Sequence, residues 1–184
     1  MVDNIKQTNP TLIDDLIPGT ISLGYLEKVL CLLLREGVPI RDMETILETL
    51  GDHAGALKDI DIVTEYVRQA LRRTITRRFA EANSLRVITV DPKVEDTIVA
   101  SVKKSDAGSY LAMDPDLIQK IVNITSGEID KVKDVIPNVI ILTSPIVRIY
   151  FKKLIDQFIP NITVLSYSEI DNTAQIQAIG NIAM

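Results

Sequence analysis

The sequence predicts a mixed fold, in which an N-terminal all-α helical subdomain is followed by a small α/β subdomain with about four strands. Two observations carry this prediction. Apolar residues recur every three or four positions through residues 1–83, the spacing of amphipathic helices. In residues 84–184, short β-branched runs alternate with helical segments. A short polar stretch over residues 80–84 separates the two patterns and marks the expected boundary.

Four helices are predicted in the first half, each from its apolar spacing and its end signals. Pro18-Gly19 ends the first, Ser22 caps the second, and Gly37 ends the second in the manner of a left-handed residue. The predicted helices cover residues 11–17, 22–36, 41–52 and 59–79.

The second half is predicted to alternate strands and helices, as in a layered α/β fold with right-handed crossovers. Proline at the first helical position marks the start of each helix. Strands are expected over 85–90, 138–142, 163–165 and 174–179, the last at a sheet edge, with helices over 92–102, 114–132 and 144–158 and a loop over 106–109.

The amino-acid composition indicates which class of protein this chain belongs to. Of the 184 residues, 46% are hydrophobic and 24% are charged, as in an ordinary globular chain. With 20 basic and 25 acidic residues the net charge is -5, opposite in sign to that of most non-specific nucleic-acid binders. No apolar run approaches the ~18 residues that span a bilayer. We therefore expect a soluble, cytosol-compatible protein.

The sequence contains no strong candidate for a catalytic residue, and we expect no catalytic site, no cofactor and no metal. Phosphate-loop, dinucleotide and metal-binding motifs are absent from the sequence. His53 could act as a base, but its place at a helix end favours a contact with the helix dipole. Cys31 is expected to be a buried, inert thiol on the apolar stripe of its helix. At Thr143-Ser144-Pro145, simple N-capping by Ser144 is favoured over an anion site.

Arginines near the end of the fourth predicted helix flank its apolar stripe. At ~100° per residue, Arg68 and Arg72 lie on one flank, and Arg73 and Arg77 lie on the other. In one interpretation of this pattern, the aliphatic parts of the arginine side chains are buried and their charged ends are solvated. Salt bridges to a neighbouring domain or subunit are the other.

Arg41 and Asp42 form a second notable pair, at the start of the third predicted helix. An aspartate there is explained by capping, whereas an arginine opposes the helix dipole and suggests a partner elsewhere. Glu44 and Glu48 are possible local partners, and an acid on another subunit is equally plausible.

Several of these stretches resemble the bacterial type III secretion export gate family, most closely its flagellar members. The resemblance covers essentially the whole chain and is most specific across residues 12–73. It is carried by Leu16-Ile17-Pro18-Gly19, by residues 23–30, by Val38-Pro39-Ile40-Arg41-Asp42, by residues 67–73 and by residues 164–170.

The resemblance implies a piece of a longer protein with a transmembrane N-terminal half. This chain would be the last two subdomains of the cytosolic half: a helical one (10–83) and an α/β one (84–184). Residues 1–9 would be the tail of a preceding helix or a linker, and Met1 would mark a recombinant or truncated reading frame. The place implied is the cytoplasmic face of the bacterial inner membrane, with membrane contact only through the missing half.

The resemblance also implies a ring of identical subunits, commonly nine, which docks export substrates, their chaperones and components of the export ATPase complex. The family's chaperone-docking pocket lies mainly in the missing subdomains and is not carried over. From the residues we assign the ring interface to Arg41, Asp42, Arg68 and Arg72.

Two other functions remain as alternatives. Consecutive helices joined by a short turn at 37–40 mimic a DNA-binding helix-turn-helix regulator, although the helix that would read the groove, 41–52, is acidic and would repel phosphate. A small α/β enzyme is the second alternative, and the lack of a convergent polar triad argues against it.

Overall fold

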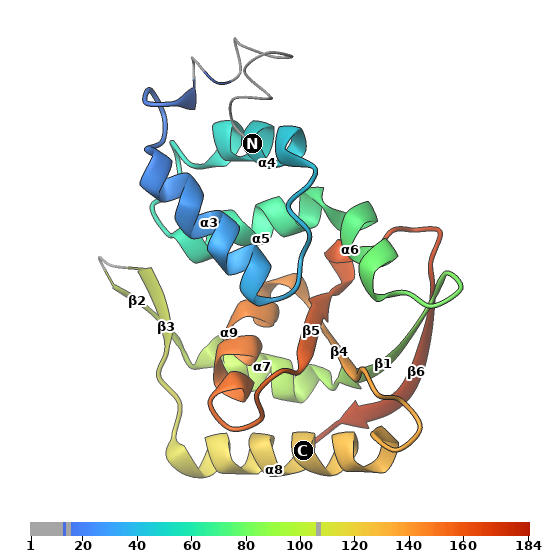
Figure 1. Cartoon of the computed structure of the whole chain (residues 1–184). Helices are drawn as coiled ribbons and strands as arrows, with labels where there is room; N and C mark the ends of the chain where they lie inside the picture. Colours follow the sequence, from blue (N-terminus) through green and yellow to red (C-terminus); the bar gives the residue numbers. More distant parts are fainter. Residues whose placement is uncertain (1–12, 14–15, 106–107) are drawn as a thin grey trace. The chain divides into compact units, whose positions relative to one another are not determined.

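The computed structural model describes residue 13, residues 16–105 and residues 108–184. These form two compact units, Met1–Arg78 and Phe79–Met184, and each is described by itself (Figure 1). The expected tail over 1–9 lies outside the described residues, as does most of the expected helix over 11–17.

The first unit is built from helices that begin and end where the local chemistry directs. Ser22 and Asp59 accept hydrogen bonds from the backbone amides of Tyr25 and Asp61, and so cap two of them. Gly37 follows the first of these helices at φ +71°, a left-handed conformation that favours glycine. The helices are α3 (Leu23–Arg35), α4 (Met43–His53), α5 (Ile60–Ala70) and α6 (Arg72–Phe79).

Helix α5 is the centre of this unit, because both α3 and α4 pack against it. Their inward faces repeat every three or four residues, as the sequence predicts. The fully buried side chains on these faces are Val29, Leu33, Ile46, Leu47, Leu50, Val63 and Val67.

Two predictions for this unit are wrong. The single helix over 59–79 is broken at Leu71, whose ψ of 13° separates α5 from α6. The break escapes sequence analysis because Leu71 and Ile75 continue the buried spacing across it. Cys31 is exposed, not buried. It lies about 180° around α3 from the centre of the buried stripe.

The second unit contains a four-stranded sheet with the order β5-β4-β1-β6, in which each neighbouring pair is parallel. This confirms the α/β prediction and places the last strand at an edge. Ile179 forms a bulge in that strand, because Val87 pairs with Ala178 and Ile88 pairs with Gly180. The strands are β1 (Ser84–Val90), β4 (Ile140–Thr143), β5 (Thr163–Ser166) and β6 (Gln175–Ile182).

Helices pack around this sheet to close its core. Helix α9 packs on β4 and β5 and also contacts α7, while α8 packs on β6 (Figure 1). Buried side chains from all of these elements, among them Ile88, Ile98, Ile121, Ile141 and Phe151, form one continuous cluster. The helices are α7 (Pro92–Ala100), α8 (Pro115–Val132), α9 (Pro145–Asp156) and the short η1 (Tyr167–Glu169).

A small hairpin in this unit was not predicted. Strands β2 (Val102–Ser105) and β3 (Gly108–Leu111) pair antiparallel, where the sequence suggested a helix end followed by a loop. Each strand has only four residues, and β2 shows no alternation of buried and exposed side chains, so the sequence carries no period-two signal.

None of the helices in the described part of the chain combines the length and the apolar content needed to cross a bilayer.

Candidate functional site

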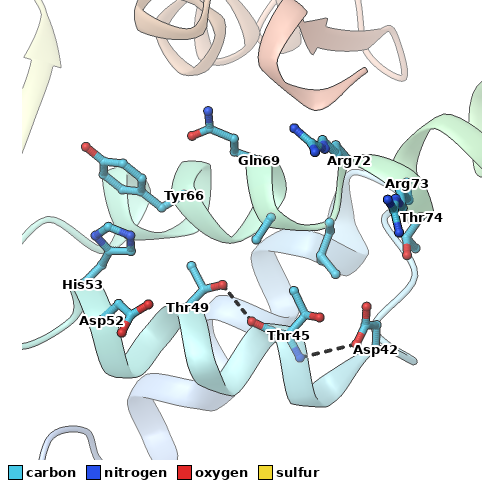
Figure 2. A pocket seen from close by; sticks show the side chains of 12 residues that line it. Asp42, Thr45, Thr49, Asp52, His53, Tyr66, Gln69, Arg72, Arg73 and Thr74 are labelled. Atoms are coloured by element: carbon cyan, nitrogen blue, oxygen red, sulfur yellow. Dashed lines mark hydrogen bonds between the residues drawn. The ribbon is translucent and has the colours of Figure 1, made fainter. Parts of the chain in front are cut away.

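A groove of about 590 Å³ runs between α4 and the helices α5 and α6 of the first unit (Figure 2). Its walls are mostly polar, and charged side chains stand at both ends of the wall that α4 provides. The lining residues are Asp42, Thr45, Thr49, Asp52, His53, Tyr66, Gln69, Ala70, Leu71, Arg72, Arg73 and Thr74.

The α4 wall of the groove is held by two local hydrogen bonds, both visible in Figure 2. The Asp42 carboxylate accepts from the backbone amide of Thr45 at 3.3 Å and thereby caps the helix. The Thr49 hydroxyl donates to the Thr45 carbonyl at 2.7 Å. Because both bonds lie within α4, they fix this wall without a ligand.

His53 closes α4 at the other end of the groove. Its ring stacks on Tyr66 of α5, with the ring centroids 4.1 Å apart and the planes 12° from parallel. His53 is also the basic residue in the last turn of its helix, as the helix-dipole interpretation predicts. This arrangement ties α4 to α5 through packing and supplies no orienting partner for base catalysis.

The structure brings together two of the four residues expected at a ring interface. Asp42 and Arg72 line the same groove. Arg41 is exposed just ahead of the Asp42 cap, so it precedes α4, whereas the sequence analysis placed it inside the helix. In the described part of the chain, neither Glu44 nor Glu48 pairs with Arg41, so its expected local partners are not used.

Arg68 does not share that surface. Its side chain is 1% exposed, and its Nη1 lies 3.3 Å from Oε2 of Glu36, the residue that follows α3. The expected exposed flank is wrong for this residue, because a cation placed toward the core is stabilised by an acid at the end of a neighbouring helix. Arg68 therefore ties α3 to α5 inside the unit.

A buried charge cluster in the second unit was missed by sequence analysis. Arg148 of α9 is fully buried, with Nε 3.9 Å from Oε1 of Glu169 and Nη1 donating to the Val164 carbonyl. The other oxygen of Glu169 accepts from the Ser166 backbone amide at 2.6 Å. Helical spacing could have indicated that Arg148 is buried, since it lies three positions before buried Phe151 on the apolar face of its helix.

The prediction that the Ser144 side chain caps α9 is wrong. Ser144 occupies the N-cap position, but its side chain makes no capping hydrogen bond. Its backbone amide donates instead to Oε1 of Glu95 at 2.7 Å. A carboxylate from α7 therefore occupies the helix N-terminus, where the dipole favours negative charge.

Comparison with known proteins shows what this architecture belongs to. The profile of the FHIPEP family matches residues 1–175. The chain belongs to the FHIPEP family. This confirms the resemblance to type III secretion export gates. The chain is 38% identical, over 98% of its length, to the flagellar biosynthesis protein FlhA of Bacillus subtilis (strain 168) and covers 27% of that relative.

Solved structures agree with the family assignment. The chain resembles Chlamydia pneumoniae CdsV, solved in complex with CdsO, with a TM-score of 0.87, 33% identity and coverage of 100% of this chain and 54% of that one. It also resembles the nonameric EscV cytosolic domain from the type III secretion system, with a TM-score of 0.81, 30% identity and coverage of 99% and 54%.

The chain thus spans about a quarter of the length of the curated FHIPEP relatives it matches. It corresponds to a part of their cytosolic domain in the type III export gate. These relatives are flagellar and secretion-system proteins, and the comparisons give no support to a helix-turn-helix regulator.

Proposed function

We propose that this chain is a portion of a bacterial flagellar type III export gate that acts as a non-enzymatic, ring-forming docking platform. The observation that carries the proposal is the likeness to the EscV cytosolic domain, which covers 99% of this chain and which assembles as a nonamer. A subunit of such a ring works through the surfaces it presents to neighbours and to incoming proteins.

The partners we propose are export substrates, their chaperones and components of the export ATPase complex. The complex of CdsV with CdsO supports an export-related partner for a protein of this fold. We place the whole protein at the cytoplasmic face of the inner membrane, held there by a membrane-spanning part outside this chain.

We assign the ring interface of the helical unit to the groove and its margin, with Arg41, Asp42 and Arg72 as contact residues. Arg41 and Arg72 are exposed, and neither makes a side-chain ion pair within the described residues. Arg41 lies just before the N-terminus of α4, where a cation is disfavoured by the helix dipole. An acidic surface of a neighbouring subunit would offset that cost.

Arg68 belongs to this interface only indirectly. Its ion pair with Glu36 holds α3 on α5, and α5 supplies one wall of the groove. We therefore propose that Arg68 positions the wall and does not itself touch the neighbouring subunit.

Charge reversal tests the interface assignment. Arg72→Glu in the complete cytosolic region is expected to abolish ring assembly measured by light scattering across protein concentration, since one reversed charge would be repeated at every subunit contact. Arg77→Glu is the matched control, because Arg77 is exposed on the same helix but does not line the groove. Equal loss of assembly in both variants would refute the assignment.

A further inference from the structure

The edge strand β6 lacks the features that usually keep a sheet edge from pairing. Within the described residues it pairs with β1 on one side and with no other strand. Its sequence, residues 175–182, contains no charged residue and no proline. Natural edge strands are commonly blunted by charge, by proline or by a covering element.

The first half of the strand is the open part. Residues 175–178 are all exposed, whereas Ile179 and Gly180 are half-buried, and beyond them Asn181 is exposed and Ile182 is buried. The bulge at Ile179 separates the two halves, and beyond it Gly180 lies beneath the Glu128 carboxylate of α8. Residues 175–178 are therefore the longest continuous part of the strand that is open to a partner strand.

The hydrogen bonds between β6 and the start of β1 determine the direction of the backbone groups of β6. The Gln175 amide donates to the Asn83 carbonyl at 2.9 Å, so this residue directs its amide and carbonyl toward β1. Alternate residues of a strand point to opposite sides. Ile176 and Ala178 therefore direct their amides and carbonyls toward the open edge.

The open half is also held in place before any partner arrives. The Asn83 side-chain amide donates to the Thr173 carbonyl at 2.7 Å, and Asp171 accepts from the Thr173 amide at 3.0 Å. These contacts fix the turn that leads into β6, so a partner does not have to order the strand when it binds.

We propose that residues 175–178 form a strand-addition site that takes an extended segment of an unfolded polypeptide. Main-chain hydrogen bonds to Ile176 and Ala178 would supply the affinity, largely independent of sequence. Because the side chains of Ile176 and Ala178 share one face, the preferred segment has alternating apolar residues and low charge. The proposal rests on the proposed function, in which this chain docks export substrates, and the outward amides and carbonyls of Ile176 and Ala178 fit an extended segment of such a substrate.

A second copy of this chain is the competing occupant, and the relatives argue against it. Antiparallel self-pairing of β6 would be a two-fold contact, with the same patch on both subunits. The EscV cytosolic domain is a nonamer. An odd number of subunits cannot all be satisfied in such pairs, so in a nonamer this edge cannot be filled by pairwise self-contact throughout the ring.

Reduced, carboxymethylated α-lactalbumin, a permanently unfolded protein, is a suitable probe. We expect it to slow amide hydrogen exchange at Ile176 and Ala178 of the full chain. Ala178→Pro removes an outward amide without taking a hydrogen bond from β1 and is expected to weaken probe binding about tenfold. Gln177→Ala is the matched control, since it changes a neighbouring exposed side chain and keeps every amide.

Hydrogen-exchange protection of the β1 amides in the Ala178→Pro variant shows whether the sheet is intact. If the sheet is disturbed, Ala178→Lys is used in place of Ala178→Pro, because it keeps the amide and adds a charge at the edge. Unchanged probe binding in the variant with an intact sheet, or protection only at other amides, would overturn the proposal. If the parent chain forms a dimer and the variant with an intact sheet is a monomer, self-pairing of β6 is supported and the proposal is overturned. The ring interface is assigned to the groove of the helical unit and ring assembly is measured separately, so failure here leaves the ring proposal standing.

Discussion

Arg68 and Glu36 face each other inside the helical unit, with 3.3 Å between Nη1 of Arg68 and Oε2 of Glu36. Arg68 is 1% exposed and Glu36 is 17% exposed, so the cation depends on protein partners and not on water. The pair connects the end of α3 with α5, and through α5 it supports the wall of the groove.

Removing the charge of Glu36 tests this supporting role. Glu36→Gln leaves the buried guanidinium with a weaker partner, and we expect it to lower the free energy of unfolding by about 2 kcal/mol. Arg35→Gln, at the exposed neighbouring position, should change stability by less than about 0.5 kcal/mol. Urea denaturation of both variants provides the comparison, and equal stabilities would show that the pair does not support the unit.

Gly37 gives a test of backbone conformation alone. Its φ is +71°, and a Cβ built there meets no atom within 4 Å. Gly37→Ala should therefore destabilise by about 1 kcal/mol through backbone strain. Gly24→Ala, inside α3, should have the opposite sign because alanine is the better helix former. Thermal denaturation distinguishes the two, and a stabilised Gly37→Ala would contradict the argument.

Tyr25 makes the stability of the helical unit depend on pH in the alkaline range. Burial, with a smaller contribution from the charge of Asp59, raises the pKa of its hydroxyl above 10.0. The folded chain therefore keeps this proton at pH values where the unfolded chain has lost it, and the corresponding stability is present below pH 10 and is lost as pH rises through the folded pKa.

Tyr25→Phe removes that dependence. The Tyr25 hydroxyl oxygen is buried and has no hydrogen-bond partner among the described residues, so its loss should cost little at neutral pH. We expect the stability of the variant relative to the parent chain to increase between about pH 8 and about pH 11. Denaturant titrations at both pH values check this, and a constant difference would count against the pKa shift.

The buried cluster of the second unit makes a stronger prediction. Glu169→Gln keeps the shape of the side chain but leaves Arg148 buried without its counter-charge, and we expect a loss of about 3 kcal/mol. Glu81→Gln is the control, because its pair with Arg86 is largely exposed and should be worth less than about 0.5 kcal/mol. Hydrogen exchange of β4 and β5 amides reports on this unit, and similar exchange in both variants would contradict the prediction.

The sequence predicted the elements with strong local signals. Apolar spacing and caps located α3, α4 and α8, β-branched runs located β1, β4 and β5, and the alternation of polar and apolar residues located β6. The break at Leu71 was missed because the buried spacing continues through it and because neither proline nor glycine marks it. The β2–β3 hairpin was missed because four-residue strands are too short to show alternation.

The candidate site was predicted only in part, because side-chain partners depend on tertiary packing. Helical spacing alone cannot reveal that Arg68 meets Glu36 from another helix, or that the Glu95 carboxylate replaces the Ser144 side chain at the start of α9. Arg72 was identified because it flanks the apolar stripe of its predicted helix, and Arg41 because a cation near a helix N-terminus is locally unfavourable. That signal depends on neighbouring residues in the chain and so can be recognised in a sequence.

Ring assembly is the central claim, and light scattering across protein concentration tests it most directly. The complete cytosolic region should form a ring of nine subunits, as the EscV cytosolic domain does. The Arg41→Glu and Arg72→Glu variants should remain monomeric, while Arg77→Glu should assemble normally. Persistent monomers of the unaltered region at all concentrations, or rings of unchanged size and stability in Arg41→Glu and Arg72→Glu, would contradict the account.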